Sequence, residues 1–242
     1  MTDFQAKLIS VANQNKATEN LISDRHAELF EKLTSHMLKV NETLNLTAIK
    51  DEDGVILKHI VDSSACVPFI PHGASLCDIG CGGGFPTLVI GILRGDVSVL
   101  GVDSVTKKVS YVENTAGILG LSNVSVSNAR AEVMGQSKEY RQSFDVVTAR
   151  AVGRLNLISE LCLPLVKIGG RFLAMKSLST GEELDEAKSA IELLGGEVEN
   201  VLEYSLTNGQ ETVERTVIII KKVKNTPPAY PRNNSQIAKK PL

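Results

Sequence analysis

The sequence is poor in aromatic residues, cysteine and long apolar runs. It has no tryptophan, four tyrosines and six phenylalanines among 242 residues, so it lacks the aromatic platform on which single-strand nucleic-acid binders stack bases. Its four cysteines form neither a disulfide framework nor a paired motif typical of zinc sites. No apolar run approaches the ~18 residues that a membrane span needs, and the N-terminal segment matches no targeting signal. We therefore expect a cytoplasmic monomer with no metal and no membrane association.

Composition and charge limit what the chain can be. With 43% apolar and 22% charged residues, it is close to ordinary soluble globular proteins, which excludes collagen-like, mucin-like and wholly disordered classes. The net charge of −2 hides an uneven distribution, because residues 215–242 carry no acidic residue. Their cations are Arg215, Lys221, Lys222, Lys224, Arg232, Lys239 and Lys240. Such a segment either binds phosphates or is a solvated tail that keeps the protein soluble.

Hydrophobic periodicity divides the chain into three parts. Residues 1–70 are predicted to form a small helical unit, since apolar residues recur at three- and four-residue spacing over 21–45 and 55–67. Residues 71–223 then alternate between short apolar strands and helical segments. Residues 224–242 are so rich in Pro, Asn and Lys that we expect no regular element there.

The alternation predicts an α/β fold. Expected strands cover residues 75–79, 98–102, 124–127, 144–148 and 171–175, and expected helices cover 85–94, 105–119, 154–166 and 181–194. Strands separated by helices in this way pair in parallel, with helices on both faces. The last two strands, 198–206 and 213–223, have no helix between them and should pair antiparallel at one edge. The prediction is a Rossmann-like, mostly parallel seven-stranded sheet with an N-terminal helical unit.

A glycine-rich turn follows the first strand. Residues 78–86 read DIGCGGGFP, and glycines let the backbone approach a ligand closely. Asp103 ends the next strand, 23 residues after Gly80, where a carboxylate can accept both ribose hydroxyls of a nucleoside. The glycines are spaced G-x-G-x-G, with Phe85 where a dinucleotide fingerprint has its third glycine. The spacing favours S-adenosylmethionine over a dinucleotide, and the remaining alternative is a turn that binds nothing.

Three cations stand at the ends of successive strands. Arg130 follows the third strand, Arg150 ends the fourth and Lys176 ends the fifth. The carboxyl ends of parallel strands meet at one edge of the sheet, where ligands bind in open α/β folds. Each residue alone is more often a solvated loop charge, but together they predict an anionic substrate at this rim.

Several segments resemble a known family. They are NLTAIKDEDGVILKHIVDS, LCDIGCGGGFPTLVIGIL, GVDSVTKKVSYVENTAGILGLSNV, ARAE, FDVVTARAV, LPLVKIGGRFLAMK and the terminal YPR. From about residue 30 onward the chain resembles the RsmG (GidB) family of S-adenosylmethionine-dependent methyltransferases. The resemblance implies methylation at N7 of a guanine in 16S ribosomal RNA, the guanine at position 527 in the 530 loop. The implied partner is this RNA or the small ribosomal subunit.

The resemblance also assigns roles to positions of this chain. Together with Gly82, taken from the loop itself, the expected cofactor-binding residues are Gly80, Phe85, Asp103, Ala131, Glu132 and Arg150. The expected catalytic residues at the rim are Arg130, Arg150 and Lys176, and Lys107 is a basic position facing RNA. On charge alone, further candidate RNA-binding residues are Lys221, Lys222, Lys224 and Arg232. The chain departs from the family at Cys81, where Ser or Thr is usual, and at Lys108, where Arg is common.

The implied reaction needs no catalytic base. Guanine N7 carries an in-plane lone pair and no proton, so direct in-line attack on the methyl group suffices and alignment supplies the rate. The four histidines are therefore not needed as bases, and His59 is expected to be structural. The alternatives are a small-molecule methyltransferase, a nicotinamide oxidoreductase and a non-enzymatic RNA-binding factor. Only turnover separates the last of these from an enzyme.

Overall fold

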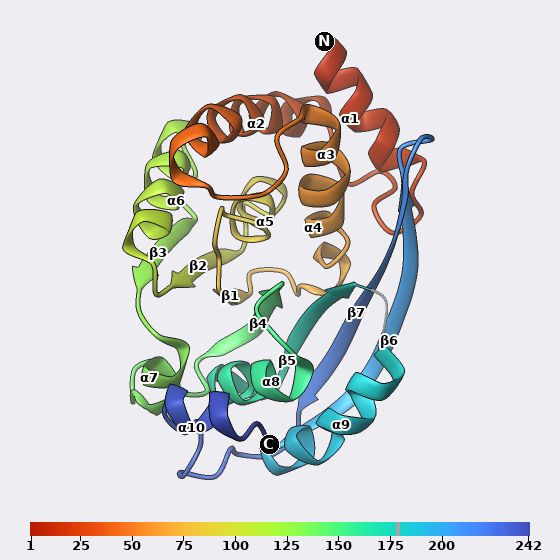
Figure 1. Ribbon diagram of the computed structural model, residues 1–242. Coiled ribbons are helices and arrows are strands. Elements are labelled where there is room, and N and C mark those ends of the chain that lie inside the picture. Colours follow the sequence, from red (N-terminus) through yellow and green to blue (C-terminus); the bar gives the residue numbers. More distant parts are fainter. Residues whose placement is uncertain (178–179) are drawn as a thin grey trace.

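The computed structural model describes residues 1–177 and 180–242 and is built on one seven-stranded sheet (Figure 1). Its strands are β1 (Ser75–Ile79), β2 (Ser98–Asp103), β3 (Val124–Asn128), β4 (Phe144–Arg150), β5 (Val166–Ser177), β6 (Gly196–Thr207) and β7 (Thr212–Lys222). The order across the sheet is β3-β2-β1-β4-β5-β7-β6, and the first five strands are parallel. β7 runs antiparallel to both β5 and β6. The predicted parallel sheet with an antiparallel edge pair is confirmed.

Helices cover both faces of the sheet. On one face lie α5 (Thr87–Leu93) and α6 (Thr106–Leu119), and on the other lie α7 (Ala131–Gln136), α8 (Leu155–Cys162) and α9 (Thr180–Leu193). They supply the crossovers that parallel strands require. Short 3-10 helices precede β1 and β5, at Val67–Phe69 and Leu163–Leu165. The inserted β7 distinguishes this strand order from the 3-2-1-4-5-6 order of dinucleotide-binding sheets.

The N-terminal helices pack on the same face of the sheet as α5 and α6, and the last of them contact the sheet itself. They are α1 (Asp3–Asn13), α2 (Asp24–Leu44), α3 (Glu52–Val55), a π-helix (Ile56–Val61) and α4 (Asp62–Ser64). Phe30 and Leu33 of α2 are fully buried in the same apolar cluster as Leu88 of α5 and Val112 of α6. The N-terminal helices therefore share a core with one face of the sheet. The domain boundary at residue 70 stays a prediction.

The β6–β7 hairpin reaches from the sheet to α1 (Figure 1). Just after α1, the side-chain amide of Asn15 donates to the backbone carbonyl of Thr207 at 2.9 Å. The side-chain oxygen of Asn15 accepts from the backbone N–H of Thr207 at 2.8 Å. Gln14 donates to the Thr207 carbonyl as well. These bonds hold the hairpin against the N-terminal helices.

Residues 224–242, called the C-terminal strap from here on, run along α7 and α8. The strap contains α10 (Asn234–Lys239), which begins with a capping box between Asn233 and Gln236. Ile237 of this helix is buried in the cluster that includes α7 and α8. The expectation that the segment forms no regular element is therefore wrong. Tertiary packing can stabilise a short helix whose composition does not favour it.

The four cysteines all lie inside the fold. Cys66, Cys77, Cys81 and Cys162 are all buried and unpaired, as expected without a disulfide framework. Burial raises the pKa of the Cys66 thiol, which keeps it protonated and unreactive. In the part of the chain that the structure describes, no three His, Cys, Asp or Glu side chains are grouped to hold a metal ion. In the same residues, no helix is both long enough and apolar enough to cross a bilayer.

Candidate functional site

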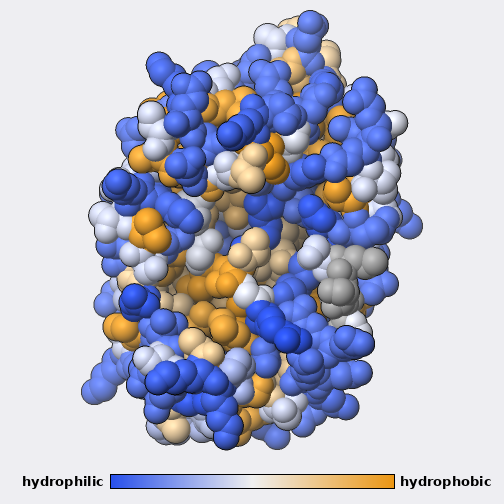
Figure 2. Space-filling model, in the orientation of Figure 1, coloured by the Kyte–Doolittle hydropathy of each residue, from blue (hydrophilic) through white to orange (hydrophobic). Residues whose placement is uncertain are grey.

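A cavity of about 520 Å³ opens at the carboxyl ends of the parallel strands. This volume lies in the usual range for small-molecule sites. Figure 2 shows the hollow in the middle of this face, with an apolar floor and polar side chains around it. The structure brings eight of the predicted site residues together in its lining, namely Gly80, Gly82, Phe85, Asp103, Arg130, Ala131, Glu132 and Arg150.

The glycine loop between β1 and α5 forms the floor of the cavity. Gly80 has a φ of +74°, a left-handed backbone conformation, and a Cβ there would lie 2.6 Å from Cγ2 of Val152. Both requirements exclude larger residues at this position. The backbone N–H groups of Gly80 and Cys81 donate to the carbonyl of Val102 at 2.8 and 3.0 Å. The loop is therefore bound to the end of β2, beside Asp103.

Asp103 is positioned by the loop it faces. Its Oδ2 accepts from the backbone N–H of Gly82 at 3.0 Å, and its Oδ1 accepts from that of Val105 at 2.9 Å. Each carboxylate oxygen has a second lone pair. Both oxygens can thus still accept from a vicinal diol, as a ribose would present.

A buried carboxylate supports the loop from below. Asp78 at the end of β1 is fully buried and accepts from the hydroxyls of Thr87 in α5 and Thr148 in β4, at 2.5 and 2.8 Å. Burial raises the pKa of Asp78 to about 6, against the effect of these hydrogen bonds. The carboxylate ties together the three elements that hold the glycine loop.

Arg150 connects the N-terminal helices to the glycine loop. One Nη donates to the carbonyl of Lys58 at 2.9 Å and to Asp62 at 2.8 Å, and Nε donates to the carbonyl of Phe85 at 3.3 Å. The other Nη lies 3.1 Å from Nδ1 of His59. Arg150 therefore fixes the positions of the π-helix and of Phe85, in addition to lining the cavity.

His59 is buried against the cavity wall. Its ring stacks on Phe85 with 4.4 Å between centroids, and burial together with nearby Arg150 lowers the pKa of His59 to about 3. The ring is thus neutral at physiological pH. Nδ1 also lies 3.1 Å from the backbone carbonyl of Lys58, and Nε2 lies 2.9 Å from Oγ1 of Thr47. The expectation of a structural His59 agrees with this placement.

Sequence reasoning missed two residues around this junction, Thr47 and Asp62. Thr47 lines the cavity, and buried Asp62 accepts from both Arg150 and, at 3.1 Å, Nε of Arg215. The available signal was the family-like segment 45–63, to which no individual role was given. The six-residue π-helix within that segment also indicates a functional site, since such helices are frequent there.

Two predicted site residues, Lys176 at the rim and the RNA-facing Lys107, lie outside the main cavity. Lys176 lines a neighbouring cavity of about 340 Å³, which shares Arg150 with the first. Its Nζ donates to the carbonyl of Gly153 and to Glu183, both at 2.7 Å. Lys107 is exposed in the first turn of α6 and does not line either cavity. A catalytic contact by Lys176 and an RNA contact by Lys107 stay proposals.

Two of the candidate RNA-binding residues, Lys222 and Arg232, make contacts inside the fold. Lys222 is fully buried, and its Nζ donates to the carbonyls of Leu163 and Leu194 at 2.8 and 2.7 Å and to the hydroxyl of Thr226. It points inward because side chains alternate along β7. Arg232 binds the carboxylate of fully buried Glu160, at 2.8 and 2.6 Å. Lys222 cannot reach RNA, and Arg232 is occupied by a buried charge.

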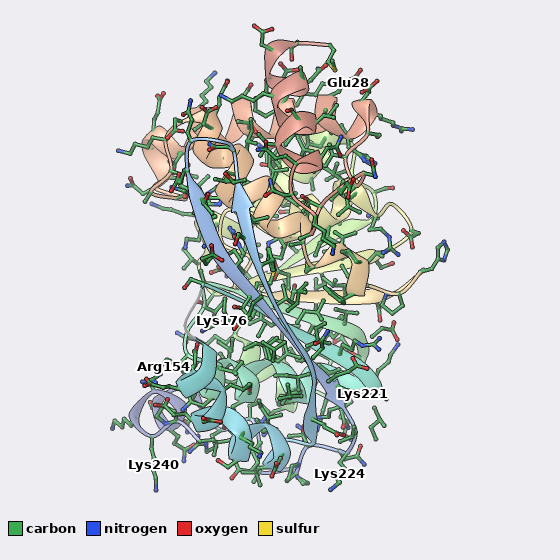
Figure 3. All side chains as sticks on the ribbon, turned by 90° about the vertical axis from the view of Figure 1, so that its right-hand side faces the viewer. Glu28, Arg154, Lys176, Lys221, Lys224 and Lys240 are labelled. Carbon is green, nitrogen blue, oxygen red and sulfur yellow. The ribbon has the colours of Figure 1, made fainter. Side chains whose placement is uncertain are left out.

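The exposed tail lysines stand at the opposite end of the sheet from the cavity. Lys221 pairs with Arg171 across β5 and β7, whereas Lys176 at the carboxyl end of β5 pairs with Thr216. Figure 3 shows Lys221 and Lys224 on one side of the molecule and Lys176 on the other. Lys221 and Lys224 therefore do not extend the charge of the rim, and an RNA contact by these two lysines would need a second surface.

Comparisons with solved structures agree with the fold. An S-adenosylmethionine-dependent O-methyltransferase from Thermotoga maritima matches with a TM-score of 0.51 and 16% identity, covering 78% of this chain and 72% of that one. M. jannaschii TYW2, solved in complex with AdoMet, matches with a TM-score of 0.55 and 12% identity, covering 68% and 76%. At these identities the likeness shows a shared fold and no more.

Comparisons of sequence are more specific. "Ribosomal RNA small subunit methyltransferase G" of Lactobacillus delbrueckii subsp. bulgaricus is 44% identical over 225 residues, 91% of this chain and 93% of that protein. The protein of the same name from Bacillus subtilis is 42% identical over 223 residues, covering 91% and 92%. The family model GidB, described as rRNA small subunit methyltransferase G, matches residues 26–213. The chain therefore belongs to the family of ribosomal RNA small subunit methyltransferase G.

Proposed function

We propose that this chain transfers the methyl group of S-adenosylmethionine to N7 of a guanine in 16S ribosomal RNA, the guanine at position 527 in the 530 loop. Membership of the family supports a methyltransferase acting on small-subunit ribosomal RNA. The observation that carries the finer proposal concerns the side chains around Arg150 that could accept a proton from a substrate. Each of them is already occupied by a hydrogen bond or an ion pair.

The cavity fits the proposed cofactor in three parts. Asp103 at the end of β2 would bind the ribose hydroxyls, and the turn at Ala131 and Glu132, after neighbouring β3, would hold the adenine. The glycine loop after β1, on the other side of β2, would receive the amino acid portion. S-adenosylmethionine, when bound, supplies an electrophilic methyl group on its sulfonium. The methyl end then faces Arg150 and Phe85, beside the N-terminal helices.

The groups near that end are poor proton acceptors. His59 has a lowered pKa of about 3, and both of its ring nitrogens lie within hydrogen-bond distance of neighbouring groups. Asp62 has one oxygen on each of two arginines. Asp78 has a raised pKa but is fully buried beneath the loop, with both oxygens accepting from hydroxyls, so it cannot contact an acceptor in the cavity. An amine or hydroxyl acceptor must lose a proton during methyl transfer, whereas guanine N7 has none to lose. The site thus supports direct attack by N7.

The target base has to be accessible on its N7 edge. In A-form RNA this edge lies in a deep, narrow groove that side chains cannot enter, so the acceptor is an unpaired or extruded guanine. Lys107, exposed in the first turn of α6, and Arg130, exposed at the start of α7, would contact the phosphates around it. These contacts would orient the RNA over the cavity.

Methyl transfer from labelled S-adenosylmethionine tests the proposal. Small subunits and free 16S RNA from cells lacking this activity are the acceptors, and chain cleavage at 7-methylguanine maps the product. One labelled guanine in the 530 loop is the expected result, and Asp103→Ala should abolish labelling whereas Lys224→Ala should not. A label on another atom, on another RNA or on a small molecule only would contradict the proposal.

A further inference from the structure

The C-terminal strap is anchored to α7 and α8 by polar contacts along its length. Arg141 donates to the carbonyls of Thr226 and Tyr230 at 2.7 and 2.8 Å, and the side-chain amide of Gln136 donates to that of Pro231 at 2.8 Å. The pair of Arg232 with fully buried Glu160 follows directly. Breaking a buried ion pair on one side is costly, so these contacts fix the path of the strap up to α10.

The anchored strap delivers one side chain to the main cavity. Asn234, the first residue of α10, lines it together with Arg130, Ala131 and Glu132. Its neighbours Asn233 and Gln236 are engaged in the capping box. The Asn234 amide makes no hydrogen bond of its own to any residue within 1–177 and 180–242. It is an exposed amide, with a donor and an acceptor, at the mouth of the main cavity.

The position of Asn234 identifies the part of the cofactor it would meet. In the sheet, β3 is next to β2, which carries Asp103, and lies on the side away from β1. With the ribose on Asp103, the adenine extends toward the β3–α7 turn, where Asn234 closes the cavity. An asparagine amide matches adenine, because it can donate to a ring nitrogen and accept from the 6-amino group at once.

We propose that Asn234 recognises the adenine edge of the cofactor, so that the C-terminal strap is the specificity-determining wall of the cofactor site. The inference rests on the proposed function, since it requires S-adenosylmethionine in this cavity. The anchors at Arg141, Gln136 and Arg232 act as positioning residues that hold the Asn234 amide at the cavity. This selectivity is for the adenine base of the ligand, so it should be the same whether or not the ligand carries the methyl group that is transferred.

Calorimetric binding of two ligands tests the proposal. S-adenosylhomocysteine is compared with its analogue lacking the 6-amino group, on the full-length protein and on Asn234→Ala. The wild-type protein should prefer the amino ligand, and the substitution should reduce that preference about fivefold, the size of one hydrogen bond. Ser235→Ala, the next residue on the same exposed turn, is the matched control and should leave the preference unchanged.

The outcomes separate this inference from the proposed function. An equal preference in the wild-type protein and Asn234→Ala overturns the role of Asn234 and leaves the function intact. A loss of affinity for both ligands alike, with the preference kept, also overturns it, because that pattern is a general disturbance of the cavity. Failure of the wild-type protein to bind S-adenosylhomocysteine at all contradicts the proposed function itself.

Discussion

Asp62 is the residue on which the junction between the N-terminal helices and the sheet depends. Its side chain is 6% exposed and neutralises two guanidinium groups, those of Arg150 and Arg215, at 2.8 and 3.1 Å. Arg150 in turn holds Phe85 and His59 at the cavity. A single carboxylate thus joins α4, β4 and β7 next to the candidate methyl-transfer site.

Replacing Asp62 by asparagine should cost about 3 kcal/mol in the free energy of unfolding, because it leaves two partly buried cations without their counter-ion. Urea denaturation of the purified variant gives the value. Glu211→Gln is the matched control, since its pair with Lys58 is exposed and should contribute no more than about 1 kcal/mol. Equal losses in the two variants would show that the buried pair has no special role.

Lys222 makes stability depend on pH. Burial lowers the pKa of Lys222 to about 7, with Arg141 as a second cause, whereas an unfolded lysine titrates near its ordinary value of about 10.4. Between these values the unfolded chain holds a proton that the folded chain does not. The free energy of unfolding should therefore rise with pH in this window, by at most about 1.4 kcal/mol per pH unit.

The comparison with Lys222→Met isolates this contribution. From pH 7 to 10, wild-type protein should gain stability relative to the variant, and below pH 7 the difference should become constant. Thermal unfolding followed by circular dichroism at matched ionic strength measures it. Parallel pH curves for the two proteins would mean that Lys222 stays charged in the fold.

At the scale of elements, the sequence pattern predicts the sheet better than the helices around it. All seven strands lie where alternating apolar residues place them, and β7 was expected beside β6. Three helices were not predicted, namely α1, α7 and α10. They are short, and packing against other elements stabilises them, which a local pattern does not record. The same limit explains Lys222, whose burial follows from its face of β7.

The glycine loop allows a test with a matched pair. Gly80 and Gly73 both have left-handed backbones, with φ of +74° and +67°. A Cβ at Gly80 would meet Val152 at 2.6 Å, whereas one at Gly73 meets nothing within 4 Å. Both alanine variants should lose about 1 kcal/mol of stability through backbone strain.

Only Gly80→Ala should also disturb the cofactor site, because the added methyl group displaces the loop that binds Asp103. We expect affinity for S-adenosylhomocysteine to fall more than tenfold in Gly80→Ala and to be unchanged in Gly73→Ala. Calorimetry measures both. Unchanged binding in Gly80→Ala would show that this loop does not form the cofactor floor.

At the scale of the whole molecule, the sequence predicted which strand-end residues line the cavity, but it did not predict which basic residues are exposed. Strand-end positions such as Asp103 and Arg150 follow from topology, because parallel strands end at one edge. Exposure of Lys221 and burial of Lys222 depend on the sheet face and on the C-terminal strap, so a count of charges could not separate them. Arg232 likewise has a buried partner, Glu160, 72 residues away in the chain.

Two double substitutions, each of which removes two positive charges, test where RNA binds. Replacing Lys107 and Arg130 by glutamine should weaken binding to 16S RNA and lower the slope of log affinity against log salt by about 1 to 2, since each phosphate contact contributes nearly one unit. Replacing Lys221 and Lys224 in the same way should leave the slope unchanged. Filter binding over a salt series measures both, and the reverse order would place the RNA on the opposite end of the sheet.

The most direct test of the central claim changes one atom of the acceptor base. Small-subunit RNA is assembled with 7-deazaguanine at the target position, which replaces N7 by carbon and leaves the pairing edge intact. The account predicts that this RNA still binds with similar affinity and receives no methyl group, while the guanine-containing control is methylated. Methyl transfer to the 7-deaza RNA at the same nucleotide would contradict attack by N7 and would require a different acceptor atom.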